Sequence, residues 1–165
     1  MARVVSLRDI KDLHVEERCA HTYVSYKLTC DRGVTHELVR HRVFSFAQES
    51  SRYCNYGQNK FGNQITVINP SFWEFGSAQY DLWCELQQLS EAAYMQILEA
   101  GGTPEEARAV LTNSLKAEII MTGNLNAWDH FFQLRYFGST GKPHPQMLEL
   151  ATLIYDRFPF KEAIL

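Results

Sequence analysis

The alternation of apolar and polar residues predicts the first regular element of the chain at residues 23–30. The segment Tyr-Val-Ser-Tyr-Lys-Leu-Thr-Cys sets β-branched or aromatic residues between polar ones, which is typical of a β-strand with one buried face. The triplet Asp-Arg-Gly at 31–33 follows as a turn signal. Thr35 can cap a short helix over residues 35–41, so the pattern predicts a strand, a turn and a helix in succession.

Helical periodicity dominates the second half of the chain. Apolar residues recur at helical spacing and predict the longest helix, from about residue 77 to residue 100: Leu82, Leu86, Leu89, Ala93 and Ile97. A capping box with proline in the first turn, at 103–106, opens the next helix. The remaining predicted elements are strands at 65–68 and 115–122 and helices at 126–136 and 146–157.

The order of these elements indicates the fold class. Strands and helices mix without a regular βαβ rhythm, and neither a GxGxxG nor a Walker sequence occurs. A composition with 45% hydrophobic and 21% charged residues is that of a globular protein. We therefore predict one α+β domain over residues 1–165, with a mixed or antiparallel sheet flanked by helices.

Charge and cysteine usage exclude several function classes. The formal net charge of -3 argues against nonspecific binding to nucleic acid, which needs broad positive surfaces. No apolar run reaches the length of a membrane span and no signal peptide opens the chain, so we expect a cytoplasmic protein without a membrane partner. The four cysteines lack a CxxC pair and the six histidines lack metal-ligand spacing, so no metal site is expected.

One segment, residues 40–53, concentrates cations and hydroxyl groups, and we call it the basic motif. Three arginines, one histidine and three serines fall within its fourteen positions. Guanidinium forks and serine hydroxyls are suited to phosphate, so the motif predicts a site for a polyanion held beside a planar ring. Glu49 and Arg52 flank Ser50, and the cations of the motif favour phosphate binding over a nucleophilic role for this serine.

The spacing within the basic motif resembles the signature of the flavin-dependent thymidylate synthases. Arg40-His41-Arg42 is followed after seven residues by Ser50, and Arg52-Tyr53 begins two positions later. Downstream, residues 107–111 match part of a helix that family members carry. Asn124 at the end of a strand and Leu134-Arg135 at the end of a helix match as well, so the resemblance spans roughly residues 23–157.

The resemblance implies a reaction and its cofactors. Family members methylate dUMP to dTMP, with methylenetetrahydrofolate as the carbon donor, FAD as the hydride carrier and NADPH as the reductant. Their active sites form where the subunits of a homotetramer meet. Family members usually run longer before the first strand, so we expect a domain with a shortened N-terminus.

The resemblance also implies roles for individual residues. Arg135 would lie against the uracil ring and stabilise the negative charge that develops there. The other residues expected to bind the nucleotide are Glu37, Gln48, Glu49, Ser50, Ser51, Arg52 and Arg108. The residues expected to contact the flavin are Arg40, His41, Arg42, Val43, Asn124 and His130.

Two alternatives remain open from the sequence. A relative could alkylate C5 of another pyrimidine nucleotide, such as UMP, because no residue can be tied to the 2′-position. The chain could also be a non-catalytic subunit that binds nucleotide or flavin.

Overall fold

The computed structural model describes residues 14–58 and 62–164, which form two compact units. The first unit comprises the described residues of 1–26, 41–45 and 121–165. The second comprises those of 27–40 and 46–120. The divisions fall within strands, so each unit contains part of the sheet described next.

Three strands form a single sheet in the order β1-β3-β2. They are β1 (Tyr23–Asp31), β2 (Ser45–Gln48) and β3 (Lys116–Asn124). The hydroxyls of Ser25 and Thr122 hydrogen-bond across β1 and β3 (2.8 Å), and the amide of Glu49 donates to the carbonyl of Glu118 just beyond β2. In the described part of the chain the sheet is antiparallel and six α-helices accompany it, so the predicted α+β fold is confirmed.

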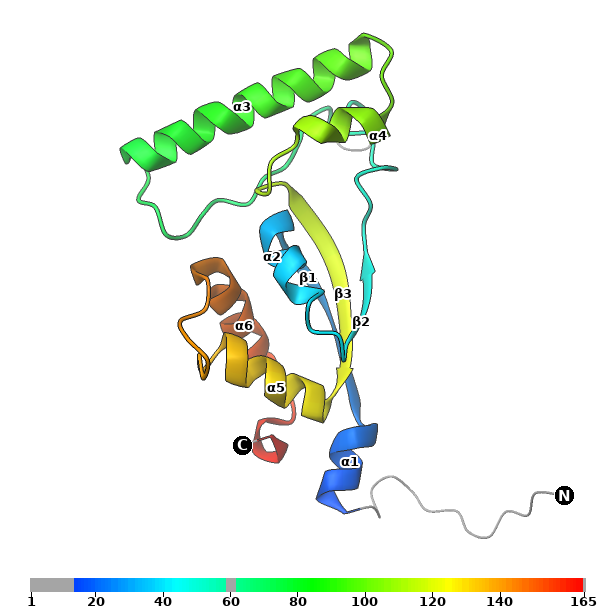
Figure 1. The fold of residues 1–165 in the computed structure, drawn as a ribbon, viewed down its shortest axis with the longest axis vertical. Helices are drawn as coiled ribbons and strands as arrows, with labels where there is room; N and C mark the ends of the chain where they lie inside the picture. The colour runs from blue at the N-terminus through cyan, green and yellow to red at the C-terminus, as the bar shows by residue number, and fades with distance from the viewer. Residues whose placement is uncertain (1–13, 59–61, 165) are drawn as a thin grey trace, which may run out of the picture. The chain divides into compact units, whose positions relative to one another are not determined.

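In the first unit, helices α1 (Val15–His21), α5 (Leu125–Arg135) and α6 (Pro145–Arg157) surround an aromatic core. Helix α5 contacts both α1 and α6, and Figure 1 shows it beside α6. Trp128 is fully buried, and its indole N–H donates to the carbonyl of Val24 (3.2 Å). Edge-on contacts join Trp128 to Phe44 and to Phe131. This core fixes α5 against the start of β1 and the loop at 41–45.

In the second unit, the long helix α3 (Ala78–Glu99) lies beside α4 (Pro104–Ala107), as Figure 1 shows. The 3-10 turn η3 (Arg108–Val110) continues from α4, and the short helix α2 (Arg32–Leu38) follows β1. Thr103 caps α4 as predicted and Ser77 caps α3, because their side-chain oxygens accept amide hydrogen bonds of the first turns. Tyr94 of α3 is fully buried in the core of this unit.

Between Trp83 and Ser90, the inward face of α3 is polar. The indole N–H of Trp83 donates to Ser114 Oγ (2.8 Å), and Ser90 Oγ donates to the carbonyl of Val110 (2.7 Å). Between them, Gln87 Oε1 accepts from the hydroxyl of Thr112 (2.6 Å). These three side chains follow one another at helical spacing, so they fasten residues 110–114 to α3 along one stripe.

The leucines that predicted α3 lie on the opposite side. Leu82, Leu86 and Leu89 are 66%, 54% and 68% exposed. The predicted helix is confirmed almost to the residue, yet these three leucines face away from the core of their own unit, whereas Ile97 of the same predicted stripe packs against it. The periodicity indicated a helix correctly but could not indicate which surface covers it.

Several predicted boundaries are wrong for a physical reason. Helix α2 begins at Arg32 rather than at Thr35, because the Asp31 carboxylate accepts from the amide of Val34 (2.7 Å) and acts as the N-cap. Thr35 is instead buried inside the helix. The strand predicted at 65–68 is reduced to an isolated bridge between Val67 and Leu115. Helix α1 and strand β2 were not predicted.

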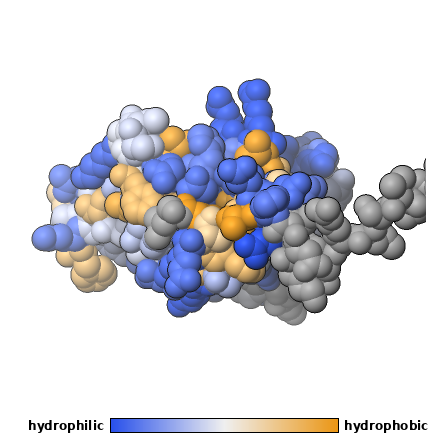
Figure 2. All heavy atoms as spheres, turned by 90° about the horizontal axis from the view of Figure 1, so that it is seen from below, coloured by the Kyte–Doolittle hydropathy of each residue, from blue (hydrophilic) through white to orange (hydrophobic). Residues whose placement is uncertain are grey.

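Figure 2 shows one face of the molecule, on which apolar side chains lie among polar ones. Within residues 14–58 and 62–164, no helix combines the length and the apolar character that crossing a membrane requires. The same part of the chain contains no group of three or more histidine, cysteine or acidic side chains arranged to hold a metal ion.

Gly123, near the end of β3, lies directly against the ring of Phe44. A Cβ atom at this position would overlap the ring. We expect Gly123→Ala to lower the free energy of unfolding by about 1–3 kcal/mol, the usual cost of overpacking a core. Urea denaturation measures the change. Phe44→Leu makes room for the added methyl group, so the double variant should lose less stability than the two single losses combined, and simple additivity would contradict the proposed clash.

Candidate functional site

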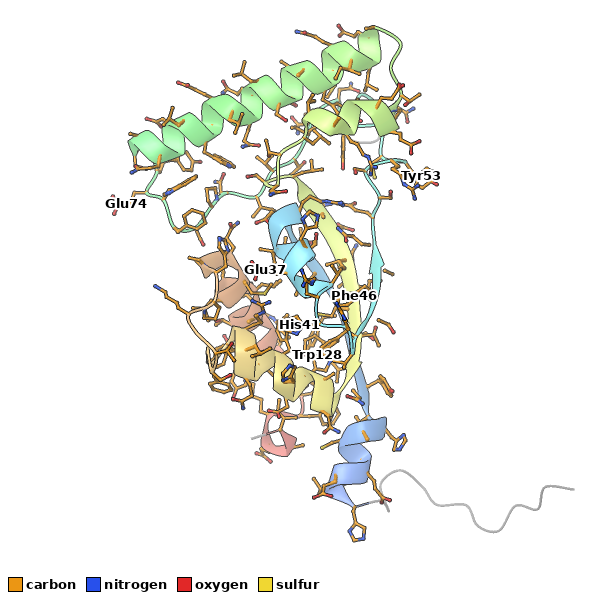
Figure 3. All side chains as sticks on the ribbon, viewed as in Figure 1. Glu37, His41, Phe46, Tyr53, Glu74 and Trp128 are labelled. Carbon is orange, nitrogen blue, oxygen red and sulfur yellow. The ribbon has the colours of Figure 1, made fainter. Side chains whose placement is uncertain are left out.

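The first four residues of the basic motif differ in their exposure to solvent. His41 is only 7% exposed, whereas Arg40, Arg42 and Val43 are exposed. Figure 3 labels His41 near Trp128 in the first unit. The histidine is therefore part of the packed interior, and its neighbours carry the charge that the surface presents.

Arg135 at the end of α5 donates a hydrogen bond from Nε to His41 Nε2 (3.1 Å). The imidazole also packs edge-on against Phe131, with ring centroids 5.2 Å apart. Burial, the charge of Arg135 and the nearby His130 together lower the pKa of His41 to about 4, with burial as the largest cause. Nε2 accepts only when it carries no proton, so His41 is neutral near pH 7, with its proton on Nδ1.

The hydrogen bond to His41 sets the orientation of Arg135, the candidate catalytic residue. Arginine keeps its charge at any ordinary pH, and a guanidinium held through Nε has a defined plane. Arg135 is half-buried, which strengthens its electrostatic effect relative to a fully solvated cation. The arrangement places a fixed positive charge in the first unit, as stabilisation of a developing anion requires.

The other two candidates of the first unit differ in their surroundings. Asn124 caps α5: its Oδ1 accepts from the amide of Ala127 (2.9 Å) and its Nδ2 donates to the carbonyl of Ala20 (3.0 Å). Both ends of its amide thus have structural partners. His130 is exposed, with its ring centroid 6.5 Å from that of His41. Flavin contact by either residue stays a prediction.

In the second unit, residues 48 and 49 bind neighbouring elements. Gln48 Nε2 donates to Thr35 Oγ1 (3.1 Å), which ties the end of β2 to α2. Glu49 Oε1 accepts from the amide of Glu118 (2.9 Å) and lies 3.6 Å from Lys116 Nζ. Glu37, labelled in Figure 3, is half-buried in α2. A nucleotide contact by these three side chains stays a prediction.

Ser50 organises the turn that ends the basic motif. Its carbonyl accepts from the amides of Tyr53 and Cys54, and its Oγ accepts from the amide of Arg52 (3.4 Å). The guanidinium of Arg52 is exposed and lies 5.2 Å from the centroid of the Tyr53 ring. Tyr53 itself is 79% exposed. The turn therefore presents a cation and an aromatic ring together, as recognition of a phosphorylated ring compound requires.

Arg108 borders a pocket of about 430 Å³ that lies entirely within the second unit. Ser51, another predicted site residue, also lines it. Two lining residues, Arg32 and His36, were not predicted as site residues. Their separation of four positions would have indicated a shared helical face, had Asp31 been recognised as the cap of α2.

Comparison with known proteins shows the family of the chain. Residues 6–159 match the family model described as thymidylate synthase complementing protein. The chain belongs to this family. A flavin-dependent thymidylate synthase of Mycobacterium sp. (strain KMS) is 34% identical over 149 residues, covering 78% of this chain and 56% of the relative. The protein of the same name from Pyrococcus furiosus is 33% identical over 106 residues, covering 64% of this chain and 43% of the relative.

The chain spans about half the length of these curated relatives of the thymidylate synthase complementing protein family. A solved structure of a UMP/dUMP methylase, PolB from Streptomyces cacaoi, bound with 5-Br dUMP, superposes with a TM-score of 0.67. The two sequences are 19% identical, and the alignment covers 87% of this chain and 71% of the other. The likeness shows a shared fold.

The neutral state of His41 predicts a pH dependence of stability for this family member. The unfolded chain protonates His41 below about pH 6.5, whereas the folded protein does so only near pH 4. The free energy of unfolding should therefore fall, by up to about 3 kcal/mol, as the pH drops through this window. His41→Gln keeps an acceptor for Arg135 but cannot titrate, so its stability should fall less.

Urea denaturation at pH 7 and at pH 5 measures the difference between the two proteins. His21→Gln, at an exposed histidine of α1, serves as the matched control and should fall as much as the unaltered protein does. Equal losses for His41→Gln and the unaltered protein would show that His41 does not titrate in this window.

Proposed function

We propose that this protein is a flavin-dependent thymidylate synthase that converts dUMP to dTMP. The observation that carries the proposal is the half-buried guanidinium of Arg135, oriented by a neutral histidine of the basic motif. The family of the chain and the names of its curated relatives support the same activity. We propose FAD as the cofactor, with NADPH and methylenetetrahydrofolate as co-substrates.

The roles of the residues follow from their chemistry. Arg135 stabilises negative charge on the uracil ring as C5 is alkylated, because its fixed cation interacts with the transition state more strongly than with neutral substrate. Arg52 and Ser50 donate to the phosphate. The exposed guanidiniums of Arg40 and Arg42 fit the anionic flavin cofactor, whose ring supplies the hydride when it is bound.

UMP is the second candidate substrate. The superposing PolB structure is named a UMP/dUMP methylase, so the fold occurs in a protein described as acting on both nucleotides. Turnover of dUMP and UMP in parallel, under anaerobic conditions with methylenetetrahydrofolate present or absent, distinguishes the two. A colourless protein that takes up no FAD and binds neither nucleotide would refute both dUMP and UMP as substrates.

We further propose that the active protein is a homotetramer and acts in the cytoplasm. The exposed leucine stripe of α3 supports the assembly, because contiguous apolar surface on a helix is costly in water and is typical of subunit interfaces.

Two arginines should affect the kinetics differently. Arg135→Gln should lower kcat by about 10²–10³-fold, since it removes charge stabilisation that acts in the transition state. Arg52→Gln should mainly raise the KM for dUMP, by about tenfold, because a phosphate contact persists in ground and transition states alike. Steady-state kinetics measure both. An Arg135 variant with unchanged kcat and a raised KM would contradict its role at the ring.

The assembly can be tested on the stripe itself. Leu86→Glu introduces a charge at its centre and should produce a smaller species in size-exclusion chromatography with light scattering. Gln88→Glu adds the same charge at an exposed position of α3 away from the stripe, and should leave the mass unchanged. Identical masses for Leu86→Glu and the unaltered protein would show that the stripe is not an interface.

A further inference from the structure

The pocket beside Arg108 contains more positive charge than the predicted site accounts for. It is lined by Arg32 and Arg108, together with His36 and Ser51, and all four belong to the second unit. Its volume of about 430 Å³ falls within the range of small-molecule sites, roughly 300–1,000 Å³. A single carboxylate, that of Glu105, lines the same pocket.

Neither guanidinium is neutralised by a partner. Over residues 14–58 and 62–164, no ion pair includes Arg32 or Arg108. Two permanent cations against one carboxylate leave a positive excess in the pocket. A phosphate group can accept from the forks of both arginines, so it complements this charge and this donor geometry.

The backbone that carries these side chains is held in place on both sides. The amides of Arg32 and Gly33 donate to the carbonyls of Leu115 (3.0 Å) and Asn113 (3.1 Å), which joins the start of α2 to the segment before β3. On the other side, Ser90 of α3 donates to the carbonyl of Val110, two residues after Arg108. A site whose supports are fixed in advance loses less entropy when it binds its ligand.

His36 extends the cluster along α2. It lies four positions after Arg32, hence on the same face of the helix, and its ring is exposed. An imidazole N–H is a suitable donor for a phosphate oxygen. The alternative for Arg32 and His36, a solvated helix surface with no ligand, predicts that neither residue affects anion binding.

We propose that this pocket binds the phosphate group of a phosphorylated ligand, and that Arg32 and His36 contact that phosphate together with Arg108. The proposal extends the nucleotide binding proposed above, and it rests on that function only for the identity of the phosphate carrier.

Inorganic phosphate, titrated into the full-length protein, tests the pocket without requiring any enzymatic activity. The ring signals of labelled histidines are followed by NMR, with His36→Gln identifying the signal of His36. We expect this signal to move and saturate. Arg32→Gln should weaken the apparent affinity at least about tenfold, the loss expected for one charge-assisted contact. Arg18→Gln, at an exposed arginine in the first unit, is the matched control and should change nothing.

A His36 signal that does not move, or equal losses for Arg32→Gln and Arg18→Gln, would overturn the proposal. Circular dichroism confirms that Arg32→Gln folds; if it does not, Arg32→Lys replaces it, and a loss of at least several-fold is expected because lysine lacks the planar fork. Undiminished phosphate affinity in that folded lysine variant, together with an unmoved His36 signal, would also reject the pocket.

Nucleotide binding then separates this proposal from the proposed function. Calorimetry with dUMP and with deoxyuridine should show that Arg32→Gln weakens dUMP about tenfold and leaves the unphosphorylated nucleoside unaffected. Binding of inorganic phosphate without binding of dUMP or UMP would support the pocket and refute the thymidylate synthase activity. Turnover of dUMP with an affinity that is indifferent to Arg32 would support the activity and refute the pocket.

Discussion

The hydrogen bond from Arg135 to His41 is the constraint on which the candidate site depends. Because the guanidinium cannot give up its proton, the bond forms only when the imidazole is neutral, and burial against Phe131 keeps it so. One interaction therefore fixes two things: the plane of the charged group at the end of α5, and the path of the loop that enters the basic motif. With His41 held inside, Arg40 and Arg42 remain at the surface.

In the second unit, the hydrogen bonds made by helix α3 are a comparable constraint. Residues 110–114 precede β3 and lie between two regular elements, so their polar groups need partners from elsewhere. Trp83, Gln87 and Ser90 supply those partners from one face of α3. This part of the inward face of α3 makes hydrogen bonds, and Leu82, Leu86 and Leu89 lie on the outward face. Contact between the outward face and another subunit would explain both the length of α3 and its exposed leucines.

The sequence predicted elements well where the signal was local. The capping box that begins at Thr103 marked the start of α4, because a side-chain cap is decided by residues three positions apart. The sequence did not predict elements whose formation depends on a distant part of the chain. Nothing near Ser45 shows that it begins β2, since that strand exists only by pairing with β3, seventy residues later in the chain. The start of α2 was missed because Asp31 and Thr35 are both competent caps, and only tertiary packing buries Thr35.

The contrast between local signals and distant partners applies to the candidate site as well. Arg135 and Arg108 were predictable only through resemblance, because a single arginine on a helix is most often an ordinary surface residue. The structure adds what distinguishes them physically: one is bound by a neutral imidazole, and the other borders a pocket with a second arginine that has no ion-pair partner within the described ranges. These are two different environments for the same side chain. Arg135 has a neutral hydrogen-bond partner and is suited to stabilising a developing anion, whereas two arginines that line one pocket give it a positive charge that a dianion neutralises. The first environment suits a transition state, and the second suits a phosphate that is already charged when it binds.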